Sequence, residues 1–196
     1  MNKKEISSKD FLLSILYSPG IYDNVNEPIT GRTKLTKMVF LFEEELQKSF
    51  FADNLNIELP LFEPYNFGPF SKELFDDLSF FLSIGLIVTE ETQIPLSFAE
   101  KNEFEIGHDD DWINASFEDK EQDEVEMKYL LSKQGINYVS DNIWKLYSNS
   151  QRSKLKTFKA QINGISLDAL LRYVYNKYPD FARKSVIKQK YLSNED

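Results

Sequence analysis

The spacing of apolar side chains predicts a largely helical chain. Its clearest helical stripe recurs at i, i+3, i+4, i+7 and i+11 and consists of Leu35, Met38, Val39, Phe42 and Leu46. A serine precedes each of two further stripes: Ser7 before a helix over residues 8–18, and Ser71 before a third helix that Gly85 ends. Serine caps the first turn of a helix, and glycine adopts the left-handed conformation that ends many helices.

The second half of the chain predicts a hairpin and then more helices. Two strand-like runs, residues 86–89 and 129–131, flank an acidic insertion of about 90–126 that has no clear period. The elements predicted after them are a turn at 132–135 and helices over 136–147, over 152–161 and from Ser166 to Pro179. The predicted fold class is mainly α with a small β-hairpin (α+β): a winged-helix-like helical core with C-terminal helices and the acidic insertion in the wing.

This order of elements divides the chain into two regions. Residues 1–147 form the predicted winged-helix-like domain, and residues 148–196 form a basic C-terminal helical extension packed on it. Residues 60–71, PLFEPYNFGPFS, predict a rigid loop that packs on the core. In that loop, Gly68 is expected to adopt a backbone angle that a side chain would forbid, and Pro69 to lead into the third helix.

The composition excludes several classes of protein. The 196 residues carry a formal net charge of -9 and include no cysteine, which excludes disulfides, thiolate nucleophiles and cysteine-ligated metal sites. The first ten residues lack the apolar core of a signal peptide, and no run of 18 apolar residues occurs. We therefore expect a cytoplasmic protein with no membrane association. A chain of this length needs no metal to stabilise its fold.

The charge is unevenly distributed. Residues 145–190 contain eleven Lys and Arg against two Asp, a balance of +9, whereas residues 90–126 contain fourteen acids against two Lys, a balance of -12. The basic segment is consistent with a nucleic-acid face, with internal neutralisation of the acidic stretch, or with docking of an acidic partner protein. The sequence does not separate these three alternatives.

Several motifs resemble a known family. They are GRTKLTKMVFLFE at 31–43, EPYNFGPFSKELFDDLSFFLSIGLI at 63–87, YLLSKQG at 129–135 and the ending LLRYVYNKYPDFARKS at 170–185. In this order they resemble the YwgA-like and SocA-like antitoxin domain family, also called Panacea, of bacteria and phages. The acidic insertion departs from the family pattern because it falls where a wing would lie.

The resemblance implies a non-enzymatic protein-binding module of a toxin–antitoxin or defence system. SocA-like members neutralise toxins by binding them, in one branch by delivering the toxin to a protease. The expected role is therefore that of an antitoxin, adaptor or inhibitor, with a toxin, a protease or a defence component as partner. The sequence does not decide whether the chain forms a homodimer. The alternative function is a transcriptional regulator that binds nucleic acid through the basic C-terminal region.

Aromatic and basic residues alternate near the end of the chain and form the predicted docking face. The predicted partner-binding residues are Arg172, Tyr175, Lys177, Phe181, Arg183 and Lys184. Aromatic and arginine side chains are enriched at the centres of protein interfaces, and this enrichment favours such a face. The alternative for tyrosines on the leucine stripe is that the last helix closes the core with them.

Catalytic and metal-binding chemistry has little support. His108 is the only histidine, and the aspartates that follow it are typical of a solvated acidic loop. Glu126 and Lys128 form an E-x-K that, with Asp111, has the minimal shape of a metal-dependent nuclease site, a common chance pattern. No catalytic residue, cofactor or metal is therefore predicted. In the third helix, the residues expected to point outward include Glu73, Asp76 and Asp77, which disfavours DNA reading by that helix.

Overall fold

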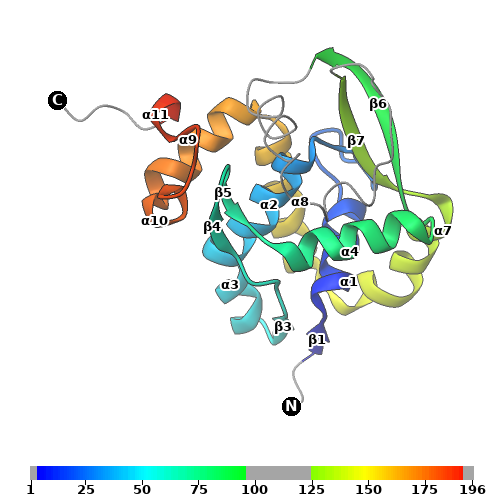
Figure 1. Cartoon of the computed structure of the whole chain (residues 1–196). Helices are drawn as coiled ribbons and strands as arrows, with labels where there is room; N and C mark the ends of the chain where they lie inside the picture. Colours follow the sequence, from blue (N-terminus) through cyan, green and yellow to red (C-terminus); the bar gives the residue numbers. More distant parts are fainter. Residues whose placement is uncertain (1–3, 96–124, 192–196) are drawn as a thin grey trace.

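The computed structural model describes residues 4–95 and 125–191 and has a mixed α+β fold that is mostly helical (Figure 1). The first half contains β1 (Lys4–Ile6), α1 (Ser8–Tyr17), β2 (Ile29–Thr30), α2 (Arg32–Glu45), α3 (Gln47–Ala52), β3 (Leu55–Ile57), β4 (Glu63–Tyr65), β5 (Gly68–Phe70), α4 (Lys72–Ser83) and β6 (Ile87–Pro95). The second half contains β7 (Val125–Leu131), α7 (Lys133–Tyr138), a π-helical turn (Val139–Ile143), a 3-10 turn (Trp144–Leu146), α8 (Asn149–Asn163), α9 (Leu167–Lys177), α10 (Pro179–Ala182) and α11 (Lys188–Tyr191).

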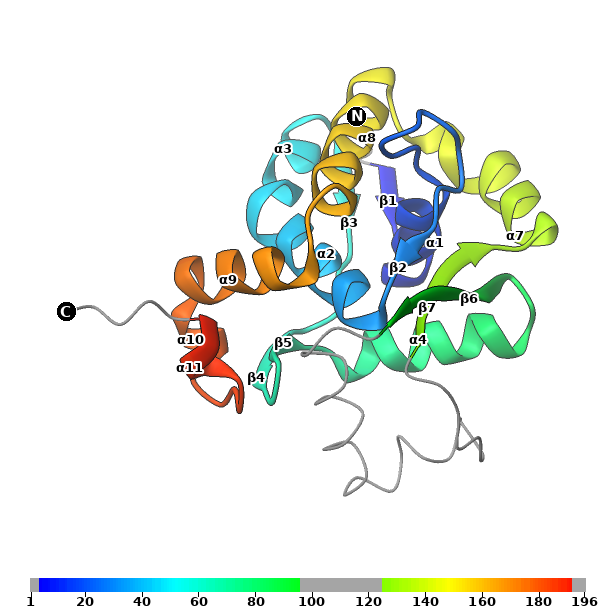
Figure 2. The same ribbon diagram turned by 90° about the horizontal axis from the view of Figure 1, so that it is seen from above.

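Helix α2 is the centre of the core. Of the predicted stripe, Leu35, Met38, Val39 and Phe42 are buried, while Leu46 follows the end of the helix and is partly buried. Phe40 and Leu41 are buried as well. A helix that is apolar on most of its circumference is stable only when other elements surround it. Helices α1, α4, α8 and α9 supply this cover (Figure 2).

Serine caps start the main helices as the sequence predicts. Ser7 accepts a hydrogen bond from Asp10 N, Ser71 from Leu74 N and Ser166 from Ala169 N. The predicted turn at 132–135 is wrong, because Ser132 instead caps α7 and accepts from Gly135 N. Gly135 belongs to α7, and the position requires glycine because a Cβ there would lie 2.2 Å from the Leu86 carbonyl oxygen.

The hairpin predicted from two short runs is confirmed and is longer than expected. Strands β6 and β7 pair antiparallel, with Ile87 opposite Leu131 and Thr89 opposite Tyr129, and β2 adds a third strand beside β7. The first and last residues of the predicted acidic insertion belong to β6 and β7, while residues 96–124 lie outside the described residues. Strands β1 and β3 form a separate parallel pair.

Residues 60–71 form a hairpin of β4 and β5 instead of a loop. Gly68 has the left-handed φ of 86° that its sequence context predicts, and a Cβ on it would lie 2.6 Å from Tyr175 Cε1. Pro69 lies in β5, and its carbonyl accepts a hydrogen bond from the buried Lys37 Nζ at 2.9 Å. This hairpin therefore joins α2 to the C-terminal helices.

The C-terminal helices pack on the hairpin and on α2. Pro179 does end α9, but it also starts the short helix α10. The Val186 N–H donates to the Asn66 carbonyl at 3.0 Å, across the β4–β5 turn. In Figure 1 and Figure 2, α9, α10 and α11 lie on the opposite side of the molecule from β6 and β7. None of the helices within residues 4–95 and 125–191 has the length and hydrophobicity that crossing a bilayer requires.

Candidate functional site

The candidate site lies on α9, one face of which is buried while the other is exposed. Leu167, Leu170, Leu171 and Val174 hold one face in the core. The opposite face is exposed and carries a shallow, open hollow along the helix. The hollow is lined by Ser166, Asp168, Ala169, Arg172, Tyr173, Asn176 and Lys177. A helix whose apolar face is fixed in this way presents its polar face without further ordering.

Glu45, at the end of α2, fixes the C-terminal end of this face. Its Oε1 accepts hydrogen bonds from Tyr173 Oη at 2.7 Å, Lys177 Nζ at 3.0 Å and Tyr178 Oη at 3.1 Å. Lys177 Nζ also donates to Tyr173 Oη at 2.7 Å and lies 5.0 Å from the centroid of that ring. The four side chains therefore form one cluster, the Glu45 cluster, which joins α2 to α9.

The protonation states in the Glu45 cluster are firmly set. Partial burial raises the pKa of Glu45, but the hydrogen bonds from Tyr173, Lys177 and Tyr178 outweigh it, and the pKa is lowered overall. Hydrogen bonds to Tyr173 and Glu45 raise the pKa of Lys177. Burial and the charge of Glu45 raise the pKa of Tyr178 to about 12. Each group therefore keeps its ordinary charge at neutral pH.

Near the N-terminal end of the hollow, α11 packs against α9 through contacts with Asp168. Tyr191 Oη donates to Asp168 Oδ1, and Lys190 Nζ lies 3.4 Å from the same oxygen. Burial and this carboxylate raise the pKa of Tyr191. Asp168 is thus partly neutralised, which leaves Arg172 as the lining cation that forms no ion pair within residues 4–95 and 125–191.

The structure separates the six predicted partner-binding residues. Arg172 and Lys177 line the hollow, and Arg183 and Lys184 are exposed in the turn after α10. Phe181 is half-buried, with its ring centroid 4.7 Å from that of Phe40.

The prediction that Tyr175 is exposed is wrong, because its side chain is completely buried. It lies one helical turn after Leu171, on the core face of α9, and its hydroxyl pairs with Ser185 Oγ at 2.8 Å. Asn176 was missed, because nothing in its local sequence marks it as part of a hollow.

Most of the basic residues counted in the sequence have partners inside the protein. Six of the eleven are engaged: Arg152, Lys154, Lys156, Lys159, Lys177 and Lys190. Four of the six pair with carboxylates, namely Asp53, Asp23, Glu45 and Asp168, and none of these lies in residues 90–126, so neutralisation of the acidic stretch by the basic segment stays untested. Arg172, Arg183 and Lys184 form no ion pair within the described parts of the chain.

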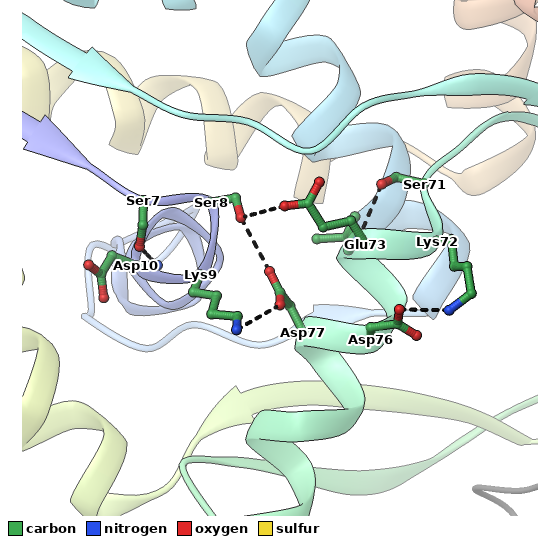
Figure 3. Close-up of polar contacts among 10 residues, drawn as sticks. Ser7, Ser8, Lys9, Asp10, Ser71, Lys72, Glu73, Asp76 and Asp77 are labelled. Atoms are coloured by element: carbon green, nitrogen blue, oxygen red, sulfur yellow. Dashed lines mark hydrogen bonds and ion pairs between the residues drawn. The ribbon is translucent and has the colours of Figure 1, made fainter.

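The polar face of α4 differs from its prediction (Figure 3). Asp77 is only 5% exposed, because it packs against α1, so its expected outward position is wrong. Ser8 Oγ donates to Asp77 Oδ2 and Glu73 Oε1, each at 3.3 Å, and Lys9 Nζ lies 3.7 Å from Asp77 Oδ1. Burial raises the pKa of Asp77, although Lys9 opposes it. Glu73 and Asp76 remain exposed.

The candidate nuclease and metal groups are only partly described. Glu126 and Lys128 are two residues apart on β7 and so share a face, with Glu90 of β6 opposite Lys128. His108 and Asp111 lie outside the described residues. Within the described parts of the chain, no group of three or more His, Asp or Glu side chains is placed to hold a metal ion.

Comparisons with protein-family models, curated proteins and solved structures found no match for this chain. The resemblance of its motifs to the YwgA-like and SocA-like family therefore stays a prediction. The chemistry of the site is argued from its own geometry.

Proposed function

We propose that this protein is a non-enzymatic protein-binding module of the SocA/YwgA type, acting as an antitoxin, adaptor or inhibitor. The observation that carries the proposal is the open hollow on α9, where Arg172, Tyr173 and Asn176 are exposed on a helix anchored in the core. Tyrosine and arginine dominate the energetics of many protein interfaces. The hollow is open rather than enclosed, as expected for a protein partner rather than for a buried small molecule.

The electrostatics of the hollow also favour binding over acid–base catalysis. An efficient general acid or base has a pKa near the working pH. The pKa of Glu45 is lowered, and those of Lys177 and Tyr173 are raised, so these groups do not exchange protons near neutrality. Lys159 does have a pKa of about 7, but its side chain is fully buried away from this face.

The order of elements supports a winged-helix relationship for the N-terminal region. A three-stranded β2–β7–β6 sheet lies beside α1, α2 and α4, as in winged helices. The additional elements α3, β3 and the β4–β5 hairpin come between α2 and α4. In this proposal the helical core is a scaffold, and the C-terminal helices are the binding element.

The test starts with affinity purification of the tagged protein from its native host, followed by titration of the identified, purified partner. We expect a stoichiometric complex whose affinity falls at least about tenfold for Arg172→Glu, with an unchanged Tm. Lys145→Glu is the matched control, because it makes the same charge change on an exposed residue outside the hollow. Equal effects of both variants, or multiple-turnover activity lost on one substitution, would contradict the proposal.

Nucleic-acid binding is the second candidate function. The exposed Arg172, Arg183 and Lys184 favour it, because none forms an ion pair within residues 4–95 and 125–191. Phosphate contacts release counterions, so a mobility shift caused by them weakens by orders of magnitude from low to moderate salt. A salt-sensitive shift that Arg183→Glu abolishes, without a protein complex, would favour this function over the first.

A further inference from the structure

The loop between α1 and β2, residues 18–28, exposes a group of apolar side chains. The exposed fractions are 49% for Ile21, 76% for Tyr22 and 47% for Val25. Single exposed apolar residues are common on protein surfaces, but three within five positions of one loop are a local concentration of the kind that marks interaction sites. We call Ile21, Tyr22 and Val25 the apolar tip.

Hydrogen bonds hold the apolar tip in one conformation. The Glu27 carboxylate accepts from the Ile21 N–H at 3.0 Å, the Tyr22 N–H at 2.9 Å and Asn163 Nδ2 at 3.0 Å. The Asn26 side chain donates to the Leu131 carbonyl at 3.0 Å and accepts from its N–H at 2.7 Å. Asn26 itself has a left-handed φ of 62°. The loop therefore has its backbone fixed on both sides of the tip.

A buried lysine donates hydrogen bonds to the backbone where this loop begins. Lys159 Nζ donates to the Leu16 carbonyl at 2.8 Å and the Ser18 carbonyl at 2.7 Å, at the end of α1. Gly20 leaves room for the Glu27 carboxylate, because a Cβ there would lie 2.3 Å from Glu27 Oε1. Two buried charged side chains, Glu27 and Lys159, are unusual beside a connecting loop, because such loops normally lie on the surface and are mobile.

The apolar tip is continuous with the hollow on α9. Ile21 Cδ1 lies 3.9 Å from the position of a Cβ at Gly164, in the turn between α8 and α9 (Figure 1). The next residue, Ile165, is 39% exposed, and Ser166 after it already lines the hollow. From Ser166 to Lys177 the helix rises about 16 Å, so the hollow begins next to the turn that Ile21 contacts and extends along α9 away from it.

We propose that the apolar tip is the energetic core of the partner-binding surface, that α9 is its polar rim, and that the partner is a protein with an apolar pocket bordered by acidic side chains. This inference rests on the proposed function and names the chemistry of the partner. The acidic border follows from Arg172, which lines the hollow on α9 and forms no ion pair within the described residues. The apolar pocket follows from the tip itself, which has no unbalanced charge: Glu27 is buried and Asp23 pairs with Lys156 at 2.6 Å.

The fixed conformation explains how a small tip can supply much of the affinity. Ordering a loop on binding costs free energy, and a loop that is already ordered avoids this cost. Tyrosine in such a position is the commonest kind of hot spot, since it combines a large apolar ring with a hydroxyl. Polyanions are a poor match for the tip, because Lys156, which contacts this loop, pairs with Asp23, and Lys159 is fully buried.

The experiment uses a photo-crosslinking phenylalanine in place of Tyr22, of Tyr173 or, as control, of Tyr138, which is 41% exposed on α7. In the native host, positions 22 and 173 should crosslink to the same protein, and position 138 should not. That protein, identified and purified, is then titrated. Ile21→Ser with Tyr22→Ser should raise Kd about thirtyfold or more, while Tyr138→Ser should leave it unchanged. Because these side chains are exposed, the Tm of the double variant should equal that of the wild type. Val25→Ser provides a second variant with a milder effect.

The outcomes separate this inference from the proposed function. If Arg172→Glu weakens the complex and the tip variants do not, the inference fails and the proposed function stands. If neither weakens it, both fail. An adduct missing at position 22, self-association of the purified protein that depends on the tip, or flotation with phosphatidylcholine–phosphatidylglycerol vesicles that Tyr22→Ser abolishes would each overturn the inference.

Discussion

Glu27 and Glu45 each gather three hydrogen-bond donors around one carboxylate, but in different surroundings. Glu27 is buried below the apolar tip and bonds mainly to backbone N–H groups. Glu45 lies at the surface and bonds only to the side chains of Tyr173, Lys177 and Tyr178. Both carboxylates have a lowered pKa, because their hydrogen bonds outweigh the effect of burial.

The difference shows how one type of contact serves two purposes. A buried charge that loses its partners costs free energy. Movement of the loop would separate Glu27 and Lys159 from their partners, so this network holds the loop in one conformation. An exposed ion pair contributes little to stability, because water competes for both partners. In the proposed function, the Glu45 cluster orients Tyr173 and Lys177 on α9, so its loss should weaken binding more than folding.

The largest expected effect is that of Lys159→Met. The substitution keeps the length of the side chain but leaves the Leu16 and Ser18 carbonyls without their donor and Glu27 without its nearby positive charge. Breaking a buried network of this kind costs about 3–5 kcal/mol. Urea unfolding measures it as a lower midpoint with an unchanged slope.

Lys156→Met is the matched control, on the same helix. Its ion pair with Asp23 is partly exposed, and its loss should cost less than about 1 kcal/mol. Equal destabilisation by the two substitutions would refute the contrast between the buried and exposed networks.

The second expectation concerns pH. Burial lowers the pKa of Lys159 from 10.5 to about 7, although the negative charge of Glu27 acts to raise it. Between these values the unfolded chain holds a proton that the folded chain has released, so the contribution of this group to the free energy of unfolding rises with pH. The difference in stability between the wild type and Lys159→Met should therefore grow from about pH 7 to about pH 10. A constant difference across this range would mean that Lys159 keeps its proton.

A smaller change is expected for Glu45→Gln. The amide still accepts one hydrogen bond from α9 but no longer attracts Lys177, so the free energy of unfolding should fall by less than about 1 kcal/mol. The pKa of Tyr178, raised to about 12 partly by the charge of Glu45, should fall, and absorbance titration of the phenols measures this. An unchanged tyrosine titration would show that the cluster does not form.

The smallest effect is expected at Asp77, a carboxylate whose surroundings lie between the two cases. Burial raises its pKa, so the folded chain holds a proton to higher pH than the unfolded chain, and stability falls as pH rises through this titration. Asp77→Asn keeps an oxygen for Ser8 and removes this dependence. The two proteins should be nearly equally stable at about pH 4, with the variant more stable by about 1 kcal/mol or less at about pH 7. A more stable wild type at pH 7 would contradict this.

The local pattern of the sequence determined most of the helices and several of their starts, although not the start of α7 at Lys133. Ser7, Ser71 and Ser166 cap helices as predicted, and Gly85 has the left-handed φ of 72° expected at the end of α4. These features depend on residues three or four positions apart, which is why a short window reveals them. The exposure of Arg172 and Lys177 was also predictable from helical spacing, whereas their role in binding remains a prediction.

Only the tertiary structure decided which polar and aromatic groups lie inside. Tyr175 and Tyr173 are neighbours on α9, yet one is fully buried behind the β4–β5 hairpin and the other is 42% exposed. Lys159 is buried because α8 passes the end of α1, and Asn163 reaches Glu27 across 136 positions of sequence. A buried charge loses its contacts with water and needs partners within the protein instead, and here those partners come from distant segments. Composition and periodicity record the side chains that can be buried, but the packing of remote helices selects the ones that are.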